Sequence, residues 1–431
     1  MTAYRVKYKL FSSSGSRAVF AGLVALLILC GTYNNIFSVA ALALCGWSVL
    51  VFKEADAISL FFFIMPMASI FKLSPGTMSL FTVLELLFVI IHVVRRRFVI
   101  SRFEVIAILF LYYIVVTGIL SGVFSVTGTI KMAMNLVLVG YLVNVDLEKQ
   151  HKSIFLHYVF GVIVSSLMWF ANSATFRITS YLERDVVGGT IAERFGRFTG
   201  LYTDPNYYSI NVIVALCLLF ALYKRAELKL DATLLLAAPL VVFAGMTGSK
   251  SAFLMLVLPL SLVFYICIKN RNYFSLFLCL VGMLILVVLF LNGHIKLFDT
   301  VLDRLRMSTG SLSDLTTSRT DIWIDYLQYF AEHPLRAVIG NGPGIYLLDG
   351  KGAHNTYIDL IYQLGIIGAI LYFTCLRFGI KKEKRLIRKN LVNRSVLLTV
   401  VVMYFFLSQL QGFDLPFQIV LAYIVWNLDV G

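Results

Sequence analysis

Two adjacent polar residues, His354 and Asn355, stand where a long polar stretch ends and a long apolar one begins, in KGAHNTYIDLIYQLG. A neutral imidazole can accept a proton from a hydroxyl group at neutral pH, so His354 is a candidate general base. A lone histidine at the mouth of a membrane helix can equally be an interfacial residue. The sequence alone leaves both interpretations open.

A second candidate is Arg319, in the segment TTSRTDIWIDYLQYF, whose apolar residues recur at helical spacing after Thr and Ser residues that can cap a helix. An arginine in the first turn opposes the helix dipole. The position becomes favourable if Arg319 meets an anion that the helix N-terminus also attracts. The alternative is an ion pair with Asp321 or Asp325. We expect this amphipathic helix against the top of a helical bundle or the lipid surface.

Further polar groups lie in two earlier segments, GRFTGLYTDPNYYS and MTGSKSA. In the first, Asp204 followed by Pro205 is typical of a helix start, with a capping side chain and a proline at the first position. Arg197 lies shortly before that start and could hold an anion. In the second segment, Lys250 occupies a tight turn, either as an interfacial lysine or as another anion ligand.

The elements that must position these residues are membrane helices. Of the 431 residues, 59% are hydrophobic and 14% are charged, whereas soluble domains run near a quarter charged. Apolar runs of about 16–25 residues favour α-helices, because hydrocarbon offers no partners for open backbone groups. The alternating segments of a membrane β-barrel are absent. The six cysteines lie inside apolar runs without a C-x-x-C motif, and predict neither disulfides nor a metal site.

The apolar runs predict an all-α polytopic membrane protein with about 14 transmembrane helices (12–14) and a large, partly helical outer-face loop. We place the helices near 18–31, 35–52, 57–72, 79–94, 103–122, 129–145, 154–171, 206–223, 231–247, 251–268, 273–291, 354–378, 396–411 and 415–428. Pro66 could kink the third segment or make it re-entrant. The last two runs, split near Gly412 and Asp414, could form a hairpin that does not fully span.

Charge predicts the orientation of these helices. The net charge is +14. If the N-terminal tail is cytoplasmic, every inside connection carries lysine or arginine, whereas the short outside turns carry almost none apart from Lys250. This positive-inside pattern predicts that both termini are cytoplasmic. The positive charge is therefore a topology signal, and we expect no nucleic-acid partner.

Two outside segments, 172–205 and 292–353, are longer than the other turns, and such loops are usually functional. Of the histidines, only His294, His333 and His354 fall on the outer side. The expected regions are N-terminal transmembrane helices (1–171), an outer, periplasmic loop (172–205), central transmembrane helices (206–291), a large outer loop with the amphipathic helix (292–353) and C-terminal transmembrane helices (354–431).

Taken in chain order, the motifs resemble those of a known family. They are Gly-Arg-x-x-Gly-x-x-x-Asp-Pro-Asn at 196–206, Thr-Gly-Ser-Lys-Ser at 247–251, Ser-Arg-x-x-x-Trp at 318–323, Gly-x-Gly-x-Gly at 340–344, His-Asn at 354–355 and YQLGIIGAILY at 362–372. Over roughly residues 190–380, this order resembles the O-antigen ligase and Wzy-type polysaccharide polymerase superfamily. Lys250 stands where an arginine is common, which keeps the charge but loses bidentate recognition of phosphate.

The resemblance implies a multi-helix glycosyltransferase of the bacterial inner membrane. Such enzymes use glycans carried on undecaprenyl diphosphate at the outer face, without a metal or nucleotide cofactor. His354 would deprotonate or orient the acceptor hydroxyl in an inverting attack on the anomeric carbon. The diphosphate ligands would be Arg319, Arg197 and Lys250, and the residues that contact sugar or position the loop would be Asn355, Asp204 and Asn206.

We expect a polymerase of O antigen, capsule or exopolysaccharide, since HNTYIDLIYQLGIIG looks closer to capsule and exopolysaccharide polymerases. The alternative is an O-antigen ligase, with lipid A–core as the acceptor. A flippase or transporter is a third candidate, but the inverted repeat and buried mid-helix charge pairs typical of transporters are not evident. Expected partners are the lipid-linked glycan, an acceptor glycan or lipid, membrane lipids, a chain-length regulator and a flippase.

Overall fold

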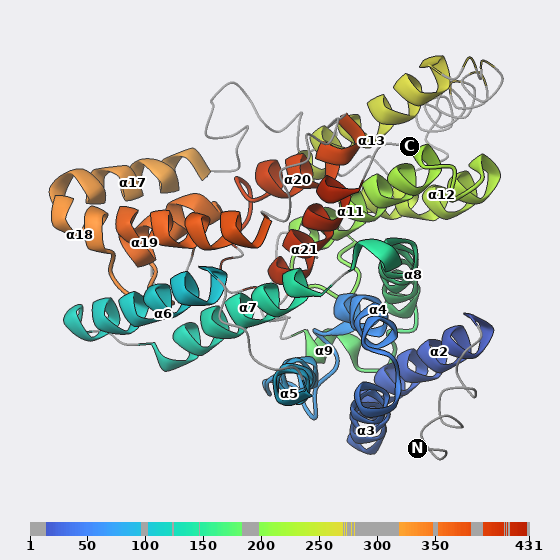
Figure 1. The fold of residues 1–431 in the computed structure, drawn as a ribbon, viewed down its shortest axis with the longest axis horizontal. Helices are drawn as coiled ribbons and strands as arrows, with labels where there is room; N and C mark the ends of the chain where they lie inside the picture. The colour runs from blue at the N-terminus through green and yellow to red at the C-terminus, as the bar shows by residue number, and fades with distance from the viewer. Residues whose placement is uncertain are drawn as a thin grey trace.

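The computed structural model of the chain is a bundle of α-helices (Figure 1). It describes residues 14–95, 102–122, 125–145, 147–182, 198–269, 271, 273, 277, 280, 319–347, 352–380, 391–408, 410, 412 and 414–428. No strand occurs in these ranges. Within them, 4 helices are long and apolar enough to cross a membrane, namely Glu148–Trp169, Pro205–Lys224, Lys250–Lys269 and Thr356–Arg377. The helical class is as predicted, and the total of about 14 spans stays a prediction.

The helices of the first half follow the predicted apolar runs closely. They are α2 (Ser14–Gly31), α3 (Asn35–Val51), α4 (Glu54–Ile64), α5 (Leu80–Arg95), α6 (Arg102–Leu120), α7 (Val126–Asn144) and α8 (His151–Trp169). The prediction of one helix over 57–72 is wrong. α4 ends at Ile64 and a 3-10 turn, Met65–Met67, follows. Pro66 is the reason, because proline has no N–H and its ring clashes with the preceding helical turn.

The second half supplies the elements that carry the candidate site. They are α9 (Ile178–Tyr181), α11 (Pro205–Lys224), α12 (Leu230–Met246), α13 (Lys250–Lys269), α17 (Arg319–Glu332), α18 (Pro334–Ile339), α19 (Thr356–Ile380), α20 (Leu391–Met403) and α21 (Leu415–Asn427). The helix predicted over 396–411 is wrong at its end, because α20 stops at Met403. The helix predicted over 273–291 falls almost wholly outside the described residues, and so do Arg197 and His294.

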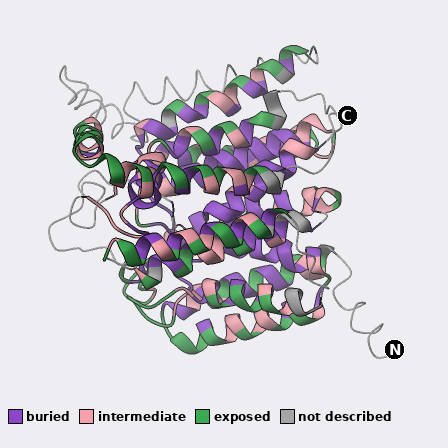
Figure 2. Cartoon of the chain, turned by 60° about the vertical axis from the view of Figure 1, so that its left-hand side comes forward, coloured by how far each residue is buried: buried purple, intermediate pink, exposed green. Residues whose placement is uncertain are grey.

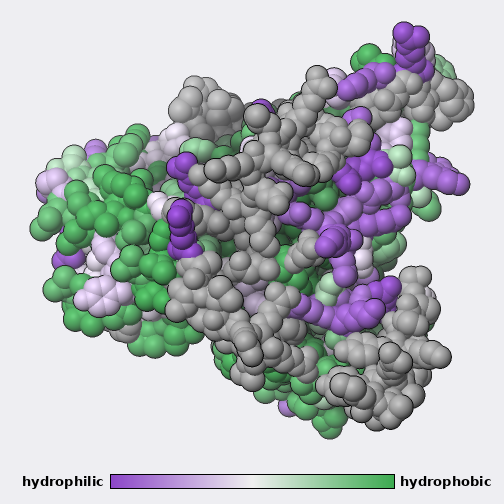
Figure 3. Space-filling view, viewed as in Figure 1, coloured by the Kyte–Doolittle hydropathy of each residue, from purple (hydrophilic) through white to green (hydrophobic). Residues whose placement is uncertain are grey.

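α11 forms the centre of the bundle. It is buried along nearly its whole length and packs against α8, α12, α13 and α20. Figure 2 shows buried residues concentrated in the interior helices and exposed ones on the outward faces. The face formed by α6, α17, α18 and α19, on the left in Figure 3, is largely hydrophobic. Exposed apolar side chains in a membrane protein are ordinary where they meet lipid.

A buried polar cluster ties α11 to α8 and α21. The amide of Gln418 donates to the Asn211 side-chain oxygen at 2.9 Å and to Asp414 at 3.2 Å, and Asn211 donates to Asp414 at 3.2 Å. The hydroxyls of Tyr158 and Tyr404 donate to Asn211 at 2.7 Å and to Gln418 at 2.5 Å. Polar groups inside a bundle are costly unless they are paired, so this network favours one helix arrangement.

α19 is two helical pieces separated by a kink at Gly365, where φ is 67° and ψ is 176°. The kink packs backbone to backbone against the end of α18. A Cβ added at Gly365 would lie 2.2 Å from the Val338 carbonyl oxygen, and one added at Gly340 would lie 2.4 Å from the Gln363 carbonyl oxygen. Glycine is needed on both sides of this contact because any side chain would fill the space.

The glycine-rich GNGPG segment docks on the same kink. The N–H of Asn341 donates to the Tyr362 carbonyl at 3.0 Å, and that of Gly342 donates to the Gln363 carbonyl at 2.9 Å. The Gly344 N–H donates to the Gln363 side-chain oxygen at 2.8 Å. The backbone groups of this segment thus fix α18 against α19.

The kink gives a test of the fold. Gly365→Ala should lower the melting temperature of the detergent-purified protein, because this backbone conformation costs a non-glycine residue about 1–3 kcal/mol and the Cβ would collide with the Val338 carbonyl. Gly22→Ala is the matched control, since a Cβ there meets nothing within 4 Å. Equal melting temperatures for the two variants would contradict the close packing of α18 on α19.

Candidate functional site

His354 lies in the turn that leads into α19. Its φ is 49°, in the left-handed region, where a non-glycine residue costs of order 1–3 kcal/mol and persists only if its surroundings enforce it. The next residue, Asn355, is buried, and its side-chain oxygen accepts from the N–H groups of Tyr357 and Ile358 at 3.0 and 3.2 Å. Asn355 is therefore the N-cap of α19, and the predicted helix start at 354 was two residues early.

The predicted amphipathic helix is confirmed as α17, which packs on the first piece of α19. Tyr326 is fully buried, its ring centroid lies 5.0 Å from that of Tyr362, and its hydroxyl accepts from the Leu347 N–H at 3.2 Å. On the opposite side, Ile324 and Leu327 are exposed. One face of the helix is thus fixed to the element that carries His354.

Arg319 is the first residue of α17, as predicted, and its guanidinium lies over the Phe406 ring, 5.9 Å from the centroid. Cations are attracted to the faces of aromatic rings at such distances. Phe406 lies in the turn after α20. The carbonyls of Tyr404 and Leu407 in that turn accept from the Thr356 N–H at 2.9 Å and the Thr356 hydroxyl at 2.6 Å. One turn therefore contacts Arg319 and holds the start of α19, which is why α20 ends early.

Asp204 and Lys250 open two neighbouring helices. Asp204 caps α11, accepting from the Asn206 N–H at 2.6 Å, which confirms the predicted helix start. The Asn206 side-chain oxygen accepts from the Ser249 hydroxyl at 2.5 Å. The hydroxyl oxygens of Ser249 and Ser251 lie 3.0 Å apart and share a hydrogen bond. Lys250, between these serines, is the first residue of α13. Asn206 thus joins the turn that carries Lys250 to the start of α11.

Electrostatics connect these separate helix starts. The pKa of His354 is lowered, first by the loss of surrounding water and then by the charge of Arg319, while Asp204 opposes the shift. Arg319 and Asp204 thus act on the charge of His354 in opposite directions. Because the imidazole stays neutral at lower pH than usual, it remains able to accept a proton at neutral pH.

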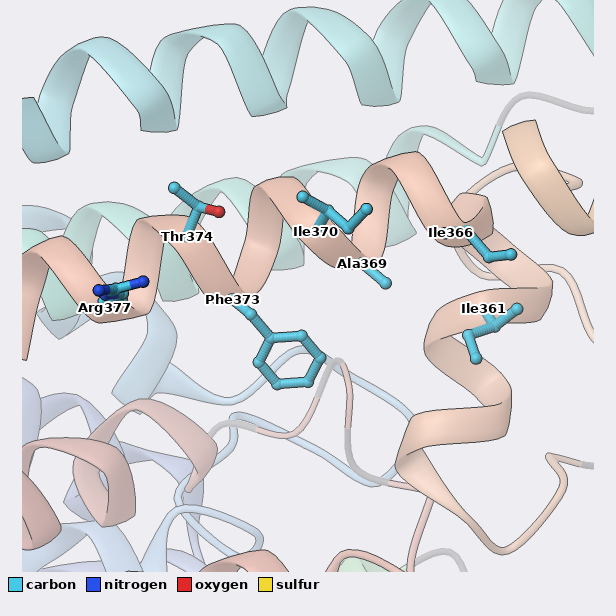
Figure 4. Close-up of a pocket in the computed structure, with 7 residues that line it drawn as sticks. All are labelled: Ile361, Ile366, Ala369, Ile370, Phe373, Thr374 and Arg377. Carbon is cyan, nitrogen blue, oxygen red and sulfur yellow. The ribbon is translucent and has the colours of Figure 1, made fainter.

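An open apolar groove follows α19 from just before its kink along the second piece (Figure 4). It is lined by Ile361, Ile366, Ala369, Ile370, Phe373, Thr374 and Arg377. Its near end, at Ile361, is about two helical turns from His354. Most of the lining is aliphatic or aromatic, so the groove suits a hydrocarbon chain rather than a polar ligand.

Comparison with protein families bears directly on this site. Residues 232–373 match the family model described as O-antigen ligase. The matched region includes Lys250, Arg319 and His354, and it confirms the resemblance to the O-antigen ligase and Wzy-type superfamily. Searches of curated proteins and of solved structures give no match. The apolar helices together with this match support a membrane enzyme of polysaccharide biosynthesis.

Two contacts of the site were not foreseen from the sequence. Ser249 stands inside the Thr-Gly-Ser-Lys-Ser motif, so the motif could have indicated its bond to Asn206. Phe406 belongs to an apolar run and carries no local signal of a contact with Arg319. Its role depends on where α20 ends, which hydrophobic periodicity does not determine.

The charges around His354 give opposite predictions for two variants. Arg319→Gln should raise the pKa of His354, because it removes a positive charge that disfavours the imidazolium. Asp204→Asn should lower it, because it removes the opposing carboxylate, while asparagine can still cap α11. An NMR titration of histidine-labelled protein in detergent measures both, with the His354 signal assigned by its loss in His354→Gln. Shifts of the same sign would contradict the placement of these three residues.

Proposed function

We propose that this protein is a polysaccharide polymerase that transfers a glycan from undecaprenyl diphosphate to an acceptor sugar hydroxyl at the outer face of the bacterial inner membrane. The observation that carries the proposal is that His354 favours its neutral form, through loss of water and the charge of Arg319, within the region that matches the O-antigen ligase family model. A base beside a cation suits a reaction in which a hydroxyl loses a proton and a diphosphate leaves as an anion.

In the proposed reaction, His354 takes the proton of the acceptor hydroxyl as its oxygen attacks the anomeric carbon of the lipid-linked glycan. The bond between that carbon and the diphosphate oxygen breaks, and its electron pair leaves with the lipid diphosphate. In-line attack inverts the anomeric carbon. Arg319, with Lys250 and Arg197, would offset the charge that grows on the leaving diphosphate.

Substrate binding would itself improve the base. In the free protein, Arg319 lowers the pKa of His354. A diphosphate held by Arg319 would cancel that effect, because a nearby anion favours the protonated imidazolium. The pKa of His354 would then rise while the donor is bound, which makes the imidazole a stronger base. Asn355 and Asp204 would hold the helix starts that place these groups, and Asn206 would hold the turn of Lys250.

The apolar groove along α19 supports a lipid-linked donor. Its near end approaches the start of α19, and its lining suits the hydrocarbon part of the carrier. Positively charged loop residues near Arg377 favour a cytoplasmic location for the far end of α19, so the groove would run from the outer side inwards. We propose the inner membrane as the location and the cytoplasm for both termini on the same grounds.

A ligase that transfers the finished glycan to lipid A–core is the second candidate, and the family match is compatible with both. The two differ in acceptor rather than in bond chemistry. In a deletion strain, loss of a polymerase leaves single repeat units on the final acceptor, whereas loss of a ligase leaves long glycan unattached.

His354→Ala should abolish polymer and leave single lipid-linked repeat units in cells, because loss of a general base costs about 10²–10⁴-fold in rate. Gel analysis of the glycan in a deletion strain that expresses the variant measures this. His333→Ala is the matched control, since His333 is another exposed histidine of the outer loop and stacks on Tyr329. Unchanged polymer length in His354→Ala would show that the base has been wrongly assigned.

A further inference from the structure

The residue before His354 is held from both sides. Ala353 is fully buried. Its N–H donates to the Asp359 carboxylate at 2.9 Å, and its carbonyl accepts from the indole N–H of Trp323 at 2.9 Å. Asp359 lies in the first turn of α19 and Trp323 in the second turn of α17. The backbone entering His354 is therefore fixed by two helices at once.

Burying the carboxylate of Asp359 at this position lowers the stability of the fold. Its side chain is 1% exposed, in a helix of apolar residues. A buried carboxylate is strongly destabilising unless hydrogen bonds offset the cost, and the first turn of a helix is where the dipole favours it. The bond from Ala353 is a hydrogen bond of this kind. Helix propensity alone would be served better by other residues at this position.

Both sides of the His354 backbone are thus restrained. The bonds to Ala353 fix the chain before it, and the Asn355 cap fixes the chain after it. Such restraint accounts for a histidine held at a φ of 49°. Trp323 also shares α17 with Arg319, one turn away. A single helix therefore sets the position of the arginine and of the peptide that carries the histidine.

We propose that Trp323 and Asp359 are positioning residues that hold His354 in its left-handed turn at the start of α19. This proposal rests on the proposed role of His354 as the base. Neither residue has to touch the substrate. The bond of Trp323 is made by its indole N–H, which Trp323→Phe removes while keeping an aromatic ring, and the bond of Asp359 is accepted by a side-chain oxygen, which Asp359→Asn keeps.

The test compares purified variants in the transfer of a defined undecaprenyl-diphosphate-linked repeat. Trp323→Phe and Asp359→Ala should each lower kcat by about tenfold or more, with little change in the KM for the donor, because small misplacements of a reacting group are costly. Asp359→Asn should keep most of the activity, because an amide oxygen can still accept from Ala353. Tyr329→Phe is the matched control. It removes one bond of α17, to Asn341 at 2.7 Å, away from His354.

A second readout separates positioning from loss of structure. If His354 leaves its turn, it moves away from Arg319 and gains water, so its pKa should rise towards the ordinary value. The acid limb of the pH–rate profile should then move to higher pH in Trp323→Phe and Asp359→Ala, but not in Tyr329→Phe. Melting temperatures of all variants show whether they are folded.

The outcomes distinguish this proposal from the proposed function. An active His354→Ala variant would overturn the role of His354 itself. An inactive His354→Ala variant, with folded Trp323→Phe and Asp359→Ala variants that keep full kcat and the native acid limb, would overturn only the positioning roles. An Asp359→Asn variant as slow as Asp359→Ala would show that the charge of Asp359, and not its hydrogen bond, is what matters.

Discussion

Backbone and side-chain polar groups at the starts of the helices must find partners where the packed helices around them exclude water. Much of the candidate site follows from this requirement. Asn355 caps α19, Asp204 caps α11, and the Thr356 hydroxyl bonds to a carbonyl of the turn after α20. Each bond joins the start of a helix to its surroundings. The two caps fix each helix start locally, and the Thr356 bond joins the start of α19 to the end of α20.

The starts of these helices carry groups of different charge. Arg319 and Asp204 act on the pKa of His354 in opposite directions, and partial loss of water together with the arginine gives a net lowering. The charge of Arg319 disfavours the protonated form of His354. An anion that binds to Arg319 would offset this charge and let His354 take up a proton more easily. This order of events matches a lipid diphosphate as the proposed donor. It also gives a physical reason for an arginine at the start of α17, where the helix dipole disfavours it.

The sequence predicted much of this arrangement, for identifiable reasons. Long apolar runs located most helices, and the Asp204–Pro205 pair marked the start of α11 because capping chemistry is local. Periodicity could not locate the kink at Gly365 or the end of α20. Those depend on contacts of Gly365 with the end of α18 and of Thr356 with the turn after α20, both remote in sequence. For the same reason the motifs flagged Arg319 and His354 but not Phe406 or Asp359.

The central claim is that His354 and Arg319 act as a unit on the lipid diphosphate. A double-mutant cycle tests it most directly, with transfer rates measured for His354→Ala, Arg319→Gln and the double variant on one purified lipid-linked repeat. When two residues act together in catalysis, removing one already causes most of the loss in rate, and removing the second adds little. The account predicts a double variant about as slow as the slower single one. A combined loss equal to the product of the two single losses would contradict it.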